Sequence, residues 1–145
     1  MADSCVFCRI IAGDTPASVV YRDDDTLAFM DIQPVNPGHT LVIPRPHVAS
    51  IRDLDAALSA RVWAVATQIA RALPSAGIRL DGLNLFLADG AEAGQEVFHV
   101  HLHVIPRFAG DGFGLRVGPH NRQLAERAAL ERVAAQIRAA GGWSD

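Results

Sequence analysis

The chain has 145 residues, of which half are hydrophobic and a fifth are charged, and its formal net charge is −3. This length and composition suit one soluble globular domain, which we predict to span residues 1–145. The slight negative charge excludes a broad basic surface, so we expect no nucleic acid and no membrane as a partner.

The start of the chain and its two cysteines bear on the cellular compartment. Residues 1–4 have no basic region leading into an apolar run, as a secretory signal would. No apolar stretch approaches the ~20 residues that span a bilayer. We therefore expect a cytoplasmic protein. In that reducing compartment Cys5 and Cys8 are not expected to form a disulfide.

The first half of the chain indicates a short helix and three strands. A helical turn over 5–12 ends at Gly13, and an acidic turn at 23–25 joins two apolar strands into a hairpin. A loop rich in proline and glycine then leads into a β-branched run that is typical of a central strand. These three strands are predicted at 19–22, 26–30 and 39–43.

The second half indicates two longer helices and two strands. A helix predicted at 56–73 carries one apolar stripe, because its large aliphatic residues recur at intervals of three and four, and Asp53 or Asp55 can cap its start. A strand is predicted at 83–87 and a last helix at about 122–139. The stripe consists of Leu58, Val62, Val65, Ile69 and Leu73.

The fifth strand is predicted around a cluster of histidines at 99–105. Half of the chain's six histidines lie here, two residues apart, so an extended backbone places all three rings on one face. Pro106 is expected to end the strand, since it cannot donate to a ladder. Short loops between neighbouring strands favour a five-stranded antiparallel sheet with helices against one face, which is an α+β fold.

The cluster suits two kinds of chemistry. The first is metal binding: Cys5 and Cys8 have the C-x-x-C spacing of half a zinc site, which His47 and one of the three histidines would complete. Such a closed site would be structural. Ligation of one metal by all three histidines is disfavoured, because rings two residues apart on a flat strand diverge.

The second kind is nucleophilic attack on phosphorus. A neutral imidazole attacks well if one ring nitrogen holds the proton and the other presents its lone pair. A backbone carbonyl that accepts from Nδ1–H would fix that tautomer. The glycine-bearing loop at 90–96 runs directly into His99, and its backbone N–H groups would hold the phosphate.

The run His99-Val-His-Leu-His103-Val-Ile resembles the signature of the histidine-triad family. Further segments that are similar to family members lie between residues 5 and 107. They are Cys5-Val-Phe-Cys-Arg-Ile-Ile, Phe29-Met-Asp31-Ile32, Pro37-Gly-His39-Thr-Leu-Val-Ile-Pro44 and Ala93-Gly-Gln-Glu-Val-Phe-His99.

The resemblance implies a homodimer whose sheets join edge to edge. It also implies a nucleotide hydrolase or nucleotidyl transferase that attacks an α-phosphate through a covalent nucleotidyl-histidine and needs no metal for the chemistry. His101 would be the nucleophile, His103 would contact the phosphate and leaving group, and His39 would orient the cluster. Asp31 would bind the ribose hydroxyls.

The same resemblance implies the remaining ligand contacts. The base would lie in an apolar slot formed by Phe7, Ile10, Phe29 and Ile32, and the phosphate loop would include Gly94, Gln95 and Glu96. Zinc would be bound by Cys5, Cys8, His47 and His99, as in zinc-bearing members.

The chain departs from its relatives at two positions in this region. Ala88 stands where close relatives have Asn or Gln, and Glu96 replaces a Ser or Thr. The expected substrates are purine nucleoside polyphosphates of the diadenosine polyphosphate kind, or phosphoramidates. The alternative is a catalytically weak, zinc-stabilised nucleotide-binding or interaction protein.

Overall fold

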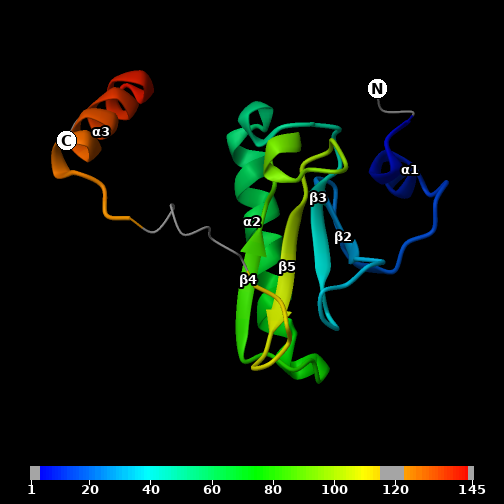
Figure 1. The fold of residues 1–145 in the computed structure, drawn as a ribbon. Helices are drawn as coiled ribbons and strands as arrows, with labels where there is room; N and C mark the ends of the chain where they lie inside the picture. Colours follow the sequence, from blue (N-terminus) through cyan, green and yellow to red (C-terminus); the bar gives the residue numbers. More distant parts are fainter. Residues whose placement is uncertain (1–3, 115–122, 144–145) are drawn as a thin grey trace. The chain divides into compact units, whose positions relative to one another are not determined.

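The computed structural model describes residues 4–114 and 123–143, which fall into two compact units, one up to Gly112 and one from Phe113 onward. The first unit is an α+β fold, as predicted (Figure 1). Its helices and strands are α1 (Val6–Ala12), β1 (Val19–Arg22), β2 (Thr26–Met30), β3 (Thr40–Pro44), α2 (Ala56–Ala72), β4 (Gly82–Phe86) and β5 (Leu102–Arg107), with 3₁₀ turns η2 (Ile51–Asp53), η3 (Pro74–Ala76) and η4 (Ala91–Ala93).

The five strands form one antiparallel sheet in the order β1-β2-β3-β5-β4. Strands β2 and β3 pair over five residues each, and every residue of β3 is buried. Strand β5 enters the sheet between β3 and β4 after the chain has passed through α2 and β4. The crossover therefore gives β5, which carries His103, an interior position in the sheet.

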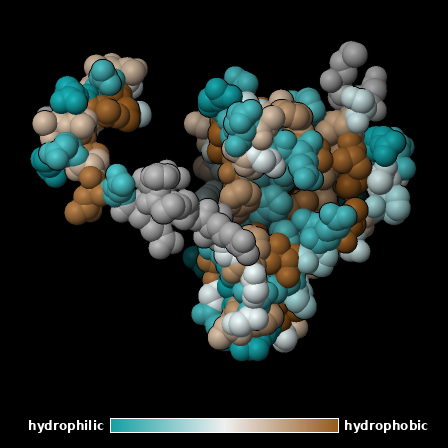
Figure 2. All heavy atoms as spheres, in the orientation of Figure 1, coloured by the Kyte–Doolittle hydropathy of each residue, from teal (hydrophilic) through white to brown (hydrophobic). Residues whose placement is uncertain are grey.

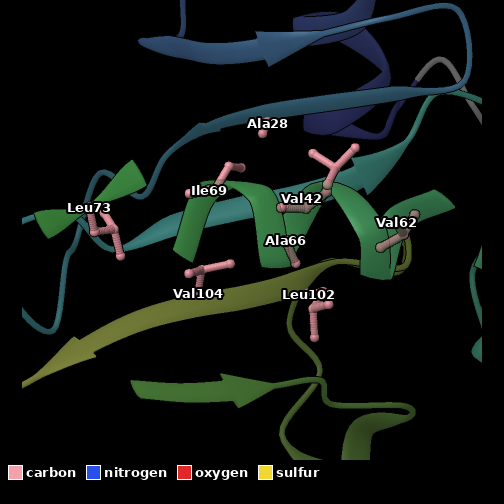
Figure 3. Close-up of a cluster of buried hydrophobic side chains, with 9 residues drawn as sticks. Ala28, Val42, Val62, Ala66, Ile69, Leu73, Leu102 and Val104 are labelled. Atoms are coloured by element: carbon pink, nitrogen blue, oxygen red, sulfur yellow. The ribbon is translucent and has the colours of Figure 1, made fainter. Parts of the chain in front are cut away.

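Helix α2 covers one face of the sheet and forms the larger core with it (Figures 1 and 3). The helix begins at Asp55, whose carboxylate accepts from the backbone N–H groups of Ala57 and Leu58. Its stripe is buried from Val62 to Leu73, and each such side chain stabilises the fold by about 1.5–3 kcal/mol. The sheet contributes Ala28, Val42, Leu102 and Val104 to this core.

A second core lies on the opposite face, where α1 packs. Phe7 and Ile10 of α1 are buried against the alternate side chains of β2 and β3, which are Leu27, Phe29, Leu41 and Ile43. The expectation that helices cover one face only is therefore wrong for α1. Full burial of β3 on both faces is the physical counterpart of its unbroken apolar run.

The histidine-rich strand differs from the prediction at both ends. Strand β5 begins at Leu102, because Val100 donates its N–H to Val48 outside the ladder. It continues through Pro106, which pairs with Leu83, so Pro106 does not end the strand. The Pro106 carbonyl accepts from Asn36 on the side away from β4. Because N–H and C=O of one residue point to the same side, the missing N–H costs no ladder hydrogen bond with β4.

The second unit contains helix α3 (Arg127–Gly141), which ends at Gly142 in the left-handed conformation. The helix was expected from residue 122, and that residue lies outside the described part of the chain. Leu130, Val133 and Ile137 are each slightly more than half exposed, and Figure 2 shows hydrophobic and hydrophilic surface side by side on this unit. None of the helices in the described ranges is long and apolar enough to cross a membrane.

Candidate functional site

A cavity of about 440 Å³ lies between α1, the sheet and the loop that precedes the histidines. Its lining brings together nine of the predicted nucleotide-binding residues. They are Phe7, Ile10, Phe29, Asp31, Ile32, Gly94, Glu96, His101 and His103.

Aromatic and aliphatic side chains form one part of the cavity wall. The rings of Phe7 and Phe29 meet edge to face with centroids 5.4 Å apart, and Ile32 is almost fully exposed at the rim. The Phe7 ring also contacts the His101 ring at 5.3 Å. The apolar wall and the imidazoles are thus continuous, so a planar ring held by the wall would lie beside the histidines.

His101 has one nitrogen fixed by the backbone. Its Nδ1 lies 2.7 Å from the carbonyl oxygen of His99, so Nδ1 carries the proton and donates it. The ring is buried, and it lines the cavity. Nε2 therefore holds an unshared electron pair, which is the state required of a nucleophile.

His39 and His103 form a second ordered pair. The backbone N–H of Val35 donates to Nδ1 of His39 at 3.1 Å, so the proton of His39 is on Nε2. The Nε2–H of His39 donates to Nδ1 of His103 at 2.8 Å, which leaves the proton of His103 on Nε2. His103 lines the cavity, and it can serve there as a hydrogen-bond donor to an oxygen atom that carries negative charge.

Burial keeps the imidazoles of His39 and His103 neutral. It lowers the pKa of His103 to about 4, and the neighbouring His101 and His39 rings act in the same direction. Burial also lowers the pKa of His39, against the opposing effect of the Asp31 carboxylate. The histidine pair therefore stays uncharged at neutral pH and acts through its oriented N–H groups.

The hydrogen bonds of His39 also bear on metal binding at this end of the site. Asp31, His39 and His103 have ligand atoms within 4.8 Å of one another. Both nitrogens of His39 are used, however, since Nδ1 accepts from Val35 and Nε2–H donates to His103. A metal would have to displace that proton, so His39 and His103 form a hydrogen-bonded pair, with the Asp31 carboxylate 3.5 Å from Nε2 of His39.

A different set of donors gathers beside the cavity. Cys5, Cys8, His47 and His99 each place one ligand atom within 4.8 Å of the others, and both cysteines are free thiols. Nδ1 of His99 lies 3.6 Å from Sγ of Cys5 and 3.7 Å from Sγ of Cys8, and Nδ1 of His47 lies 3.3 Å from Sγ of Cys8. Two sulfurs and two imidazole nitrogens suit tetrahedral zinc.

The outer hydrogen bond of His99 also fits a metal ligand. Its Nε2 lies 2.8 Å from the carbonyl oxygen of Pro44, so Nε2–H donates and Nδ1 is left free to face the cysteines. Burial lowers the pKa of His99 and keeps the ring neutral, as ligation requires. Cys5, Cys8, His47 and His99, hereafter the Cys2His2 cluster, join α1 to the segment that carries His101.

Gln95 is the predicted nucleotide-binding residue that does not line the cavity. Its side-chain oxygen accepts from Gly90, and its nitrogen donates to the carbonyls of Ala49 and Val97. Gln95 is buried and stabilises the loop that precedes His99. Glutamine can serve a loop backbone or a ligand, and the sequence pattern does not distinguish the two.

Two further residues of this region have roles that the sequence did not indicate. Asp89 accepts from Ser50, from the backbone of Ile51 and from Arg52, so its carboxylate fixes the start of η2. Phe86 lines the cavity, with its ring centroid 5.8 Å from that of His103. Phe86 pairs with His103 across β4 and β5. The local sequence pattern does not specify the register of these two strands, so it did not indicate Phe86.

Comparisons with known proteins identify relatives of this chain. A profile of the HIT domain matches residues 12–110. An uncharacterised HIT-like protein of Borreliella burgdorferi is 49% identical over 115 residues, which cover 79% of this chain and 83% of that protein. The Arabidopsis thaliana protein named adenylylsulfatase HINT3 is 37% identical over 111 residues, which cover 74% of this chain and 54% of that protein.

Solved structures share the fold over nearly the whole chain. A zinc-bound histidine triad family protein from Mycobacterium smegmatis has a TM-score of 0.75 and 42% identity, covering 94% of this chain and 99% of that one. A histidine triad nucleotide-binding protein from Candida albicans has a TM-score of 0.84 and 26% identity, covering 96% and 98%.

Proposed function

This chain belongs to the HIT family, and we propose that it is a nucleotide hydrolase or nucleotidyl transferase that acts through a covalent nucleotidyl-His101 intermediate. The observation that carries the proposal is the hydrogen bond from Nδ1 of His101 to the His99 carbonyl, which leaves Nε2 unprotonated in a cavity with an apolar wall. Relatives named as an adenylylsulfatase and as a nucleotide-binding protein support the ligand class.

The proposed substrates are purine nucleoside polyphosphates of the diadenosine polyphosphate kind, or phosphoramidates. Phe7, Ile10, Phe29 and Ile32 would hold the base, and Asp31 would bind the ribose hydroxyls. Gly94 and its neighbours would contribute backbone N–H groups to the phosphate, and Nε2–H of His103 would donate to a phosphate oxygen.

The reaction would take two steps. In the first, Nε2 of His101 forms a bond to the α-phosphorus, and the bond to the leaving group breaks, with the electron pair and a proton from water going to that group. The Nδ1–H donated to the His99 carbonyl stabilises the positive charge that the ring acquires. In the second, water bonds to phosphorus, the N–P bond breaks, and the water's proton returns to solvent.

Replacement of His101 tests this proposal. We expect His101→Asn to lower the turnover of a fluorogenic adenosine phosphoramidate and of a diadenosine polyphosphate by roughly 10³-fold or more, because the nucleophile is lost. Wild-type protein quenched during turnover should carry one nucleotidyl group on the peptide that contains residue 101. Near wild-type turnover by a folded His101→Asn protein rules the assignment out.

The second candidate is a nucleotide-binding protein with little turnover. Ala88 is buried and offers no polar side-chain group where such a group would contact the phosphate region. Tight nucleotide binding measured by calorimetry, with no adduct on residue 101 and no product, would favour this candidate over the enzyme.

We also propose that the Cys2His2 cluster binds one structural zinc ion. The ligand types, their mutual proximity and the outer hydrogen bond of His99 support this. A zinc-bound relative has the same fold. Metal analysis of purified protein should give one zinc per chain, and a value near zero that Cys5→Ser leaves unchanged would contradict the proposal.

A homodimer with a continuous sheet is the proposed assembly. The sheet ends in two edge strands, β1 and β4, each of which pairs with one neighbouring strand within the described residues and would pair with a second copy on its other side. Sedimentation equilibrium should give twice the mass of the chain, and a monomer at micromolar concentration would contradict the proposal.

A further inference from the structure

The charge of the cavity wall is unusual for a site that is to hold phosphates. Two carboxylates, those of Asp31 and Glu96, line the cavity, and its described lining includes no arginine or lysine. All 13 basic residues of the chain are arginines, so lysine is absent from the sequence altogether. Sites for several phosphates ordinarily neutralise them with such cations or with a metal ion.

The two carboxylates differ in their surroundings. Asp31 accepts from the backbone N–H of Gln33, and its other oxygen lies 3.5 Å from Nε2 of His39. Glu96 is exposed, and no hydrogen bond or ion pair to another residue within 4–114 or 123–143 holds its carboxylate. The charge of Glu96 is therefore available to a ligand.

Glu96 also has a position that the other lining acid lacks. It lines the cavity that contains His101 and His103, and it lines a second cavity of about 400 Å³ beside Cys5 and His47. Glu96 thus belongs, with Val6 and Val97, to the wall that the two cavities share. A group bonded to a phosphorus atom at His101 and extending into the second cavity would pass this carboxylate.

Resting on the proposed function, we propose that Glu96 is a specificity-determining residue that selects substrates whose leaving group carries a positive charge. The corresponding substrate class is a nucleoside phosphoramidate whose amine bears a second, protonated amino group. The histidines and loop N–H groups can hold one phosphate, whereas a chain of further phosphates would place negative charge beside Glu96. Two unit charges about 4 Å apart in water interact strongly enough for roughly a fivefold effect.

The test uses adenosine 5′-phosphoramidates of matched size whose leaving amine carries a protonated amino group, a hydroxyl group or a carboxylate. Wild-type kcat/KM should fall in that order, by roughly fivefold per step in low salt and by less in high salt. Glu96→Gln should compress the series to within about twofold. Glu92→Gln is the matched control, because Glu92 lies in η4 of the same loop and does not line either cavity.

The assays contain no added divalent cation, since a metal ion held by Glu96 would reverse the sign of its effect. A wild-type series in which the three substrates are cleaved equally well overturns the role of Glu96 and leaves the proposed function standing. The same holds if Glu92→Gln compresses the series as much as Glu96→Gln does. Absence of cleavage of every substrate by the wild type overturns the proposed function and, with it, this inference.

Discussion

At the scale of single residues, the proton positions of the histidines are set by backbone groups. The Val35 N–H fixes the tautomer of His39, and the His99 carbonyl fixes that of His101. His103 in turn accepts from His39, and burial beside His101 and His39 lowers its pKa. Low pH must therefore work against this arrangement.

Titration of His103 predicts a loss of stability in acid. Its pKa is about 4 when folded and near 6.5 when unfolded, so the unfolded chain takes up the proton first as the pH falls. The contribution of His103 to the free energy of unfolding is complete above pH 6.5 and declines toward pH 4. We expect the difference in free energy of unfolding between wild type and His103→Asn to shrink by roughly 2 kcal/mol from pH 7.5 to pH 5. Urea titrations at both pH values measure it, and a constant difference would contradict the shift.

Gly38 gives a second residue-scale prediction. Its φ of +92° lies in the left-handed region, and a Cβ there would lie 2.9 Å from Ile78 and 3.1 Å from Pro106. Gly13 has a similar φ of +88° but open space around it. Gly38→Ala should therefore lower the free energy of unfolding by about 2–4 kcal/mol, and Gly13→Ala by only about 1 kcal/mol. Equal losses in urea titration would show that packing at Gly38 has no part in the effect.

Near the histidines, the place of a side chain in the site could be predicted only where few roles are open to that type of side chain. Cysteine and histidine at metal-ligand spacing have few other roles, and the four residues of the Cys2His2 cluster do lie together. Gln95 and Asp89 are different, because amides and carboxylates serve loop backbones as readily as ligands. Their roles depend on neighbours such as Ala49 and Ile51, which are some 40 residues away in the chain.

At the scale of elements, the start of helix α2 gives a prediction about which of two aspartates caps it. Asp55 accepts from two backbone N–H groups, and no described residue donates to the side chain of Asp53. Asp55→Ala should cost about 1 kcal/mol of stability, and Asp53→Ala should change it by less than about 0.5 kcal/mol. Thermal or urea unfolding distinguishes the two, and the reverse order would place the helix start two residues earlier.

Elements with local determinants were predicted closely. Strands β1 and β2 have the predicted bounds, because an apolar pattern and an acidic turn specify a hairpin within twelve residues. The carboxylate of Asp23 forms an ion pair with Arg61 and so connects the hairpin turn to α2. No local sequence pattern indicates this contact. Strand β5 was misplaced for a similar reason, as Val100 bonds to Val48 rather than to a neighbouring strand.

At the scale of the whole molecule, the Cys2His2 cluster joins three segments that are distant in the chain. Zinc bound to the folded state alone should raise its stability by about 4 kcal/mol when free zinc exceeds the dissociation constant 1,000-fold. The melting temperature of metal-free protein should rise accordingly on addition of zinc, and that of Cys8→Ser should not. Equal melting curves with and without zinc for the wild type would contradict a structural metal.

The order of the strands lay beyond what spacing alone could establish. The pairing of Leu41 with His103 joins residues more than sixty positions apart, and no periodicity in either strand specifies its partner. Likewise, the apolar face of α1 is compatible with either side of the sheet, and its tertiary packing, which includes Phe7 on Phe29, decides between them. The strand order and the face that α1 covers are known from the structure alone.

His99 contributes its side chain to the Cys2His2 cluster and its backbone carbonyl to the hydrogen bond with His101. Its imidazole faces the cysteines, and its peptide oxygen holds the neighbouring ring two positions on. Side-chain replacement at this site can abolish one of these without altering the other, since every amino acid retains the same oxygen. The hydrogen bond that orients the His101 ring is consequently retained by any replacement at residue 99 that leaves the backbone path there unchanged.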